Sequence, residues 1–188
     1  MAMDSSTPYW KNAERSLAFL LCLLLAGCGV WDEPANSLSV ERLELRRDYI
    51  EPIWQVRLSD SVLEALDSGV AVELVEQIVF LGPHNEVLAE HSRRFRLSHR
   101  LLTGNYQIEA SDQPTPRGFP GRSALLRGLT LPGEWRLVPP DETSHVRSRL
   151  QLDRASLPGS LRLQASWDRQ WHSHSPWYWQ ALPVQEAS

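Results

Sequence analysis

The chain has 188 residues, a length that fits one domain preceded by a leader. Hydrophobic residues make up 42% and charged residues 22% of the chain, which is typical of a folded globular domain and not of a disordered one. The formal net charge of -4 disfavours nucleic acid as a partner, because proteins that coat nucleic acid are normally basic.

The first 27 residues have the three zones of a bacterial signal peptide. Lys11 and Arg15 give a positive start, residues 16–25 form an apolar run, and the small residues Ala26 and Gly27 end the leader. The apolar run is shorter than the roughly 20 residues that a membrane-spanning helix needs. We therefore predict a cleavable signal peptide, residues 1–27, in preference to an uncleaved signal anchor.

The block Leu25-Ala26-Gly27-Cys28 resembles the lipobox at which the bacterial lipoprotein signal peptidase cuts. Small side chains before the cysteine let an extended backbone enter a narrow protease cleft, so we expect cleavage between Gly27 and Cys28. The Cys28 thiol would then carry a diacylglyceryl group and its new amine another acyl chain. Two or more acyl chains hold a protein stably on a bilayer, whereas one binds only marginally. The alternative is a soluble secreted protein.

Gly29 follows the expected lipidated cysteine. Asp at that position favours retention in the inner membrane of Gram-negative bacteria, so by resemblance we expect an exported protein on the periplasmic side of the envelope, at the outer membrane in preference to the inner. Cys22 leaves with the leader, and the mature chain then has neither a disulfide nor a free thiol. In an oxidising compartment the domain must be held together by packing alone.

The mature chain divides into a lipidated N-terminus and tether, residues 28–37, and one domain, residues 38–183. Several segments of the domain alternate apolar and polar residues, which is the pattern of strands with one buried face. In chain order we expect strands at residues 38–45, with a bulge around Glu41 and Arg42, at 54–58, at 70–81 as a central strand, at 87–97 across a turn at 82–85, at 106–108, at 146–153 and at 161–167.

Two helices interrupt these strands. The first spans residues 61–67, is capped by Ser59 or Asp60 and ends at Gly69. The second spans residues 123–127. Many short strands and few helices predict a mainly β fold, an antiparallel β-sandwich with one or two short helices. An α+β arrangement is the alternative.

Three blocks of the domain carry a family resemblance. They are residues 58–70, residues 95–102 with Tyr106, and residues 150–158 followed by the aromatic positions between 167 and 179. In this order and spacing they resemble a family of short exported proteobacterial proteins, domain of unknown function 4390, although Ser98 stands where that family has an aromatic residue. The resemblance implies an exported protein without an assigned activity. It also implies a link to envelope sensing, because family members lie near genes for membrane sensor kinases.

No pattern in the sequence predicts an enzyme. The chain lacks a Gly-x-Ser-x-Gly elbow, a His-Glu-x-x-His pair and a phosphate-binding loop. His172 and His174 alone fall short of the ligands that zinc requires, and His145 could join them only if the fold brings it near. Asp153 ends a strand before a turn, and we interpret it as the cap of that turn. We expect no catalysis, no metal and no cofactor.

Two groups of side chains are candidates for binding. Arg94 and Arg96 share one strand face within a basic stretch, which meets either anionic headgroups, an acidic partner or only solvent. The stretch consists of Arg93, Arg94, Arg96, His99 and Arg100. A second group of aromatic residues serves either as core, which is the favoured interpretation, or as an interface. The second group consists of Trp171, Trp177, Tyr178 and Trp179.

These observations predict a non-enzymatic envelope lipoprotein that is held on the membrane by lipid on Cys28. Its domain would bind a partner protein or another envelope component. One alternative is a periplasmic protein that holds a lipid or glycan in an aromatic cleft. Another is a hydrolase whose site the sequence does not reveal.

Overall fold

The computed structural model describes residues 37–46, 49–130 and 137–183. The described residues all belong to one compact unit, Pro34–Ser188. The predicted leader, Gly27 and Cys28 lie outside the described residues. Within those residues, none of the helices has the length and apolar character needed to cross a membrane.

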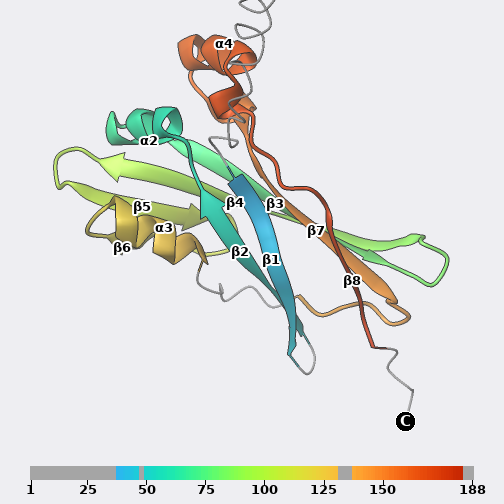
Figure 1. Ribbon diagram of the computed structural model, residues 1–188. Helices are drawn as coiled ribbons and strands as arrows, with labels where there is room; N and C mark the ends of the chain where they lie inside the picture. The colour runs from blue at the N-terminus through green and yellow to red at the C-terminus, as the bar shows by residue number, and fades with distance from the viewer. Residues whose placement is uncertain (1–36, 47–48, 131–136, 184–188) are drawn as a thin grey trace, which may run out of the picture. The chain divides into compact units, whose positions relative to one another are not determined.

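The described residues form a six-stranded antiparallel sheet and a separate two-stranded hairpin (Figure 1). The hairpin consists of β1 (Ser37–Arg46) and β2 (Tyr49–Arg57). The sheet has the order β6-β5-β4-β3-β7-β8. Its strands are β3 (Val72–Leu81), β4 (Val87–Arg100), β5 (Asn105–Ala110), β6 (Arg117–Phe119), β7 (His145–Leu152) and β8 (Tyr178–Ala181).

The expected mainly β, antiparallel fold is confirmed, while its arrangement as a sandwich stays a prediction. β3 is a central strand with buried residues on both faces, as its apolar sequence indicates. The predicted bulge is a shift of register between Val40 and Arg42. The turn before β4 contains Asn85 with φ 63°, a left-handed conformation that asparagine tolerates better than most residues.

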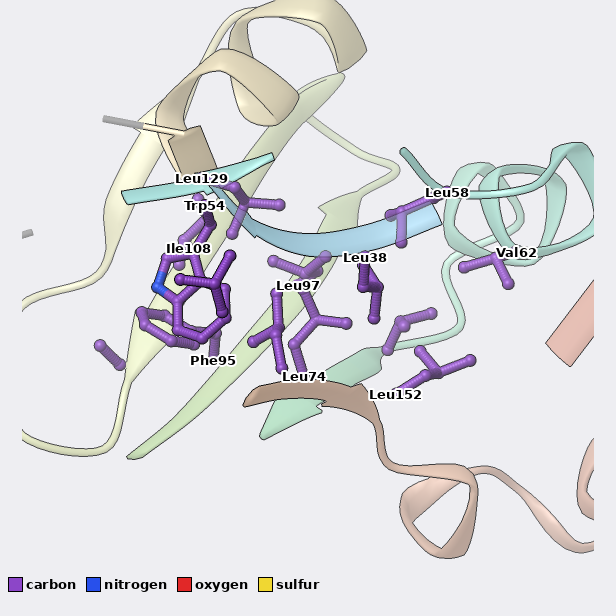
Figure 2. Packing of buried hydrophobic residues seen from close by; sticks show 14 of the residues in the cluster. Leu38, Trp54, Leu58, Val62, Leu74, Phe95, Leu97, Ile108, Leu129 and Leu152 are labelled. Atoms are coloured by element: carbon purple, nitrogen blue, oxygen red, sulfur yellow. The ribbon is translucent and has the colours of Figure 1, made fainter. Parts of the chain in front are cut away.

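One face of the six-stranded sheet shares a hydrophobic core with the hairpin. Alternate side chains of a strand point to opposite faces, and Leu74 of β3 points to the hairpin side together with its neighbours Phe95 and Leu97 of β4. Figure 2 shows Leu38 and Trp54 of the hairpin packed against these residues. Burying such side chains stabilises the fold by roughly 25 cal/mol per Å² of apolar surface removed from water.

Both predicted helices are present, and their caps follow local chemistry. α2 (Asp60–Asp67) begins after Ser59, whose Oγ accepts a hydrogen bond from the Val62 N–H at 3.3 Å. Gly69 then takes φ 88°, a conformation that favours glycine. The second helix is α3 (Arg122–Thr130). The short 3-10 helix η1 (Arg154–Ser156) follows β7, and a second one, η2 (Arg169–Trp171), follows the third α-helix at residues 159–167. The Asp153 carboxylate caps η1 by accepting a hydrogen bond from the Ala155 N–H at 2.9 Å, as predicted.

The predicted strand at residues 161–167 is wrong, because the third helix, α4 (Gly159–Trp167), occupies that segment. Leu161, Leu163 and Ala165 alternate with polar residues as in a strand, but Leu, Arg, Gln and Ala are strong helix formers. The alternation does not describe burial either, since Ala165 is buried while Leu163 is exposed. Local helix propensity therefore decides this segment, and the described residues contain three α-helices instead of one or two.

Candidate functional site

The second face of the six-stranded sheet carries arginines from β4. Val75 of β3 points away from the hairpin core, because it lies one residue from Leu74. Arg94 pairs directly with Val75, and Arg96 pairs with Glu73, so both arginines lie on this second face. Both are exposed, and their predicted sharing of one strand face is confirmed.

Two further arginines on this face come from β7, beyond β3. Arg147 pairs with Val79 and Arg149 pairs with Gln77, so the sheet register places them beside the β3 residues of the second face. The Arg149 Nε donates a hydrogen bond of 2.6 Å to the Gln77 side-chain oxygen. Val79 is buried although it lies outside the hairpin core cluster, which is consistent with cover from the long apolar stems of neighbouring side chains.

Arg147 and Arg149 alternate with two tryptophans along the sheet edge. The Arg147 Cζ lies 4.7 Å from the centre of the Trp177 ring and 5.5 Å from that of Trp179, and the Arg149 Cζ lies 4.4 Å from the centre of the Trp177 ring. The order is thus Trp179, Arg147, Trp177, Arg149. Each cation–π contact contributes about 0.5–1 kcal/mol where it is exposed and more where it is desolvated. We call these four residues, with Arg94, the Arg–Trp surface.

The Arg–Trp surface is ordered yet accessible. Trp177, Arg147 and Arg149 are half-buried, whereas Trp179 exposes 52% of its area. Stacking fixes side chains that would otherwise sample many rotamers, so less side-chain entropy is lost when a partner binds. Large aromatic and arginine side chains with restricted motion are the groups that dominate binding energy at protein interfaces.

Carboxylates on this face offset part of its positive charge. Glu73 and Glu109 pair with Arg96 from its two neighbouring strands, and Glu90 pairs with Val79. Glu73 and Glu109 offset the charge of Arg96, whereas Glu90 lies in the same row of the sheet as Arg147 and offsets part of the charge of that residue. Among the described residues, Arg94 shares its row with Val75 and Gln151, and Arg149 shares its row with Gln77 and Ser92, so the positive charge without a carboxylate in its own row is that of Arg94 and Arg149.

The structure divides the six binding residues predicted from sequence into two sets. Trp177, Trp179, Arg94 and Arg96 lie on the second face, whereas Trp171 is fully buried and belongs to the core. Tyr178 precedes Trp179 in β8, points to the opposite face and packs against the core cluster. The favoured core interpretation of the aromatic group thus fits Trp171 and is wrong for Trp179.

Arg147 and Arg149 are the site residues that sequence reasoning missed. The alternating pattern at residues 146–153 places them on the polar face of a strand, which is the only local signal that they give. Their contacts with Trp177 and Trp179 depend on the pairing of β7 with β8, which brings together residues about 30 positions apart. No short motif encodes that pairing.

Arg93, which the sequence groups with the basic stretch, belongs instead to a buried charged cluster. It faces Glu76 across β3 and β4, and its Nε donates to the Asp112 carboxylate at 2.6 Å. Glu76 is fully buried, and within the described residues neither of its carboxylate oxygens has hydrogen-bond geometry with a partner. Burial raises the pKa of Glu76 to about 8, while Arg93 and the nearby Trp54 indole oppose this effect. We interpret Glu76 as a neutral acid at neutral pH.

A second polar cluster joins the end of α2 to β4, β5 and α3. The Tyr106 hydroxyl donates to the Asp67 carboxylate at 2.6 Å, and Arg122 forms an ion pair with the other oxygen of that carboxylate. The His99 ring stacks on Tyr106 at 4.3 Å between centroids, and its Nδ1 lies 2.9 Å from the Asp67 carbonyl. The hydrogen bond to Asp67 raises the pKa of Tyr106. Because the ionisable groups are already paired, we interpret this cluster as structural.

The histidines considered for a metal site have other contacts. The His172 Nε2 lies 2.6 Å from an Arg154 guanidinium nitrogen, and the backbone of His174 forms an isolated bridge with Gln151. Among the described residues, no three His, Cys, Asp or Glu side chains converge as metal ligands would.

The comparisons with known proteins give one match. A family described as "Domain of unknown function (DUF4390)" matches residues 37–180, which run from the first residue of β1 into β8. Neither a curated protein nor a solved structure matches the chain.

Proposed function

The chain belongs to the DUF4390 family, and from that premise we propose that it is a non-enzymatic envelope lipoprotein whose Arg–Trp surface binds an acidic protein partner. The observation that carries the proposal is the alternating stack of Trp179, Arg147, Trp177 and Arg149 on the second sheet face. The family resemblance suggests the periplasmic part of a membrane sensor kinase as one such partner.

Position and chemistry support this use of the surface. Among the described residues, the hairpin, α2 and α3 place their buried side chains in the core on the opposite side of the sheet and not over the Arg–Trp surface. Arginine forks bind carboxylates through two parallel hydrogen bonds, and exposed tryptophan supplies apolar contact area. A partner with Asp and Glu around an apolar patch would therefore match the surface. We further propose that the hairpin and the sheet form the two layers of a β-sandwich.

The alternative of a lipid- or glycan-binding aromatic cleft has weaker support. Sugars and acyl chains need a free aromatic face, but two guanidinium groups lie over the ring of Trp177. The lipid anchor is a separate part of the proposal and is supported by the lipobox Leu25-Ala26-Gly27-Cys28. It would hold the domain at a membrane surface and raise its effective concentration near membrane-bound partners.

Site-specific photocrosslinking tests the binding surface. A photoreactive phenylalanine at position 179 of the full chain should give a discrete adduct in intact envelopes, whereas the same residue at the exposed position 138 should not. The double substitution Arg147→Glu, Arg149→Glu should reduce the adduct at least tenfold, because it reverses the charge that an acidic partner needs. Equal adducts at both positions, or an adduct that survives charge reversal, would reject the proposal.

A second experiment tests the anchor. Cys28→Ser removes the thiol that accepts lipid, so the variant should lose fatty-acid labelling and should no longer sediment with membranes. Unchanged labelling and sedimentation in the variant would show that Cys28 is not the anchor.

A further inference from the structure

We propose that the domain rests on the bilayer with one particular end, formed by the β4–β5 turn and α4, and that Leu101, Leu102, Leu163 and Trp167 enter the lipid. We call this set of four residues the apolar tip. The inference rests on the proposed lipid anchor at Cys28. It adds which side of the domain faces the membrane and which side chains contact lipid.

The apolar tip is unusual in its exposure. Leu102 is fully exposed, and Trp167, Leu163 and Leu101 expose 82%, 67% and 62% of their areas. Single exposed leucines are ordinary, but a Leu-Leu pair at a hairpin turn and a Leu with a Trp on one short helix are not. Tryptophan is favoured at the boundary between water and lipid, because its ring is apolar and its N–H is polar. A bilayer interface would remove this apolar surface from water.

A chain of contacts joins the two parts of the apolar tip through α2. The Leu101 side chain packs over Gly69 at the end of α2, where an added Cβ would lie 3.1 Å from the leucine Cδ1. At the other end of α2, the Ser59 hydroxyl donates to the Gln170 carbonyl at 2.9 Å. Gln170 belongs to η2, which follows α4 directly. Figure 1 shows α2 and α4 near each other at the end of the strands where β1 begins.

The chain enters the domain at this same end. Ser37 of β1 pairs with Arg57, two residues before the α2 cap. Residues 29–36 separate Cys28 from Ser37, and a fully extended chain of that length spans at most about 32 Å. The opposite end of β4, at Val87, lies about 40–45 Å from Arg100 along the strand. Contact of that opposite end with the bilayer would use the whole reach of the linker, whereas the apolar tip touches lipid without stretching it.

The charges near the apolar tip indicate which lipids it prefers. Arg100, Arg162 and Arg169 border it, but α2 between its two parts carries Asp60 and Glu64. These opposite charges leave little net attraction to anionic headgroups. We therefore infer that apolar insertion holds the tip, and that docking occurs on zwitterionic phosphatidylcholine vesicles and is insensitive to salt.

A single fluorescent label tests the orientation in the full lipidated protein. Once Cys28 is lipidated and the leader is removed, the mature chain has no other cysteine, so Leu102→Cys offers a single thiol for an NBD probe. The matched control is Val87→Cys at the opposite end of β4, a site that exposes 56% of its area. On vesicles with nitroxide-labelled lipid, we expect at least twofold stronger quenching and a blue-shifted emission at position 102, with neither change at position 87.

Flotation of the same samples separates the two proposals. If the protein floats with vesicles while the probe at position 102 emits as in water, the orientation is rejected and the anchor stands. If the protein does not float, the anchor is rejected and the orientation with it. Equal quenching at positions 87 and 102 would also reject the orientation. A second variant, Leu101→Ser with Trp167→Ser, should keep a native circular dichroism spectrum and reduce quenching of a probe at position 163.

Discussion

Single residues in this protein differ in role according to the face on which the sheet places them. Arg93 and Arg94 are adjacent in sequence, yet the first is buried beside Glu76 and the second is exposed on the Arg–Trp surface. Strand alternation explains the difference, because neighbouring side chains point to opposite faces. The buried Arg93 guanidinium donates a hydrogen bond to the Asp112 carboxylate, so its positive charge does not fully compensate a negative charge on Glu76.

The buried acid predicts that stability falls as the pH rises. Unfolded Glu76 ionises near its ordinary pKa of 4.5, whereas folded Glu76 keeps its proton up to about pH 8. Between these two pH values the unfolded state has lost the proton while the folded state still holds it. The contribution of Glu76 to the free energy of unfolding is therefore complete below pH 4.5 and is lost by about pH 8. A difference of that size corresponds to at most about 5 kcal/mol.

Glu76→Gln should remove this pH dependence, because it keeps the shape of the side chain and cannot ionise. Urea unfolding at pH 5 and pH 8.5 measures the effect. The matched control Glu73→Gln, on the same strand but the opposite face, should keep the dependence of the wild type. Parallel stability curves for the wild type and Glu76→Gln would contradict a protonated buried Glu76.

At the scale of elements, β8 is a short edge strand, and stacking supplements its backbone pairing. A double-mutant cycle isolates this effect. We expect Arg149→Ala and Trp177→Ala to show a coupling of about 0.5–2 kcal/mol in urea unfolding, since the two groups lie 4.4 Å apart. Arg96 and Trp177 serve as the control pair and should be additive, because β3 and β7 lie between β4, which carries Arg96, and β8, which follows Trp177. Additivity in both cycles would mean that the stack does not hold β8.

The end of α2 is a second element whose geometry is specific. Gly69→Ala places a Cβ 3.1 Å from Leu101 and imposes a left-handed backbone on alanine, so we expect a loss of about 1–2 kcal/mol of unfolding free energy. Gly118→Ala is the matched control, because nothing lies within 4 Å of its added Cβ. Thermal unfolding of the two variants makes the comparison, and equal melting temperatures would contradict strain at Gly69.

The elements also indicate how far sequence reasoning reaches. Long segments with regular alternation, such as β7, and helices with clear caps, such as α2, could be predicted because their signals are local. α4 could not, because two turns of helix formers imitate strand alternation. β6 and β8 are short edge strands that depend on their neighbours in the sheet. The Arg–Trp surface shows both cases. The local alternation of β4 predicts the face on which Arg94 lies, whereas the position of Arg147 and Arg149 beside the tryptophans depends on the order of the strands.

For the whole molecule, the two proposals assign different tasks to different parts of the domain. The apolar tip lies at the end where the chain enters, and the Arg–Trp surface lies on the face of the sheet opposite the hairpin. A lipoprotein arranged in this way would hold its binding face at an angle to the membrane, where a membrane-bound partner can reach it. Membrane docking and partner binding should then be separable by substitution.

Two sets of variants test that separation. Arg147→Glu with Arg149→Glu should abolish crosslinking from position 179 and leave vesicle quenching at position 102 unchanged, because both arginines lie in β7 on the second face of the sheet, whereas the apolar tip belongs to the β4–β5 turn and α4. Leu101→Ser with Trp167→Ser should reduce vesicle quenching at position 163 and leave the crosslink in detergent unchanged, since detergent removes the effect of orientation. In intact envelopes the same double serine variant should weaken the crosslink severalfold, because the face is then presented at random angles. If either set changes both readouts in detergent, the two surfaces act as one, and the division of tasks is wrong.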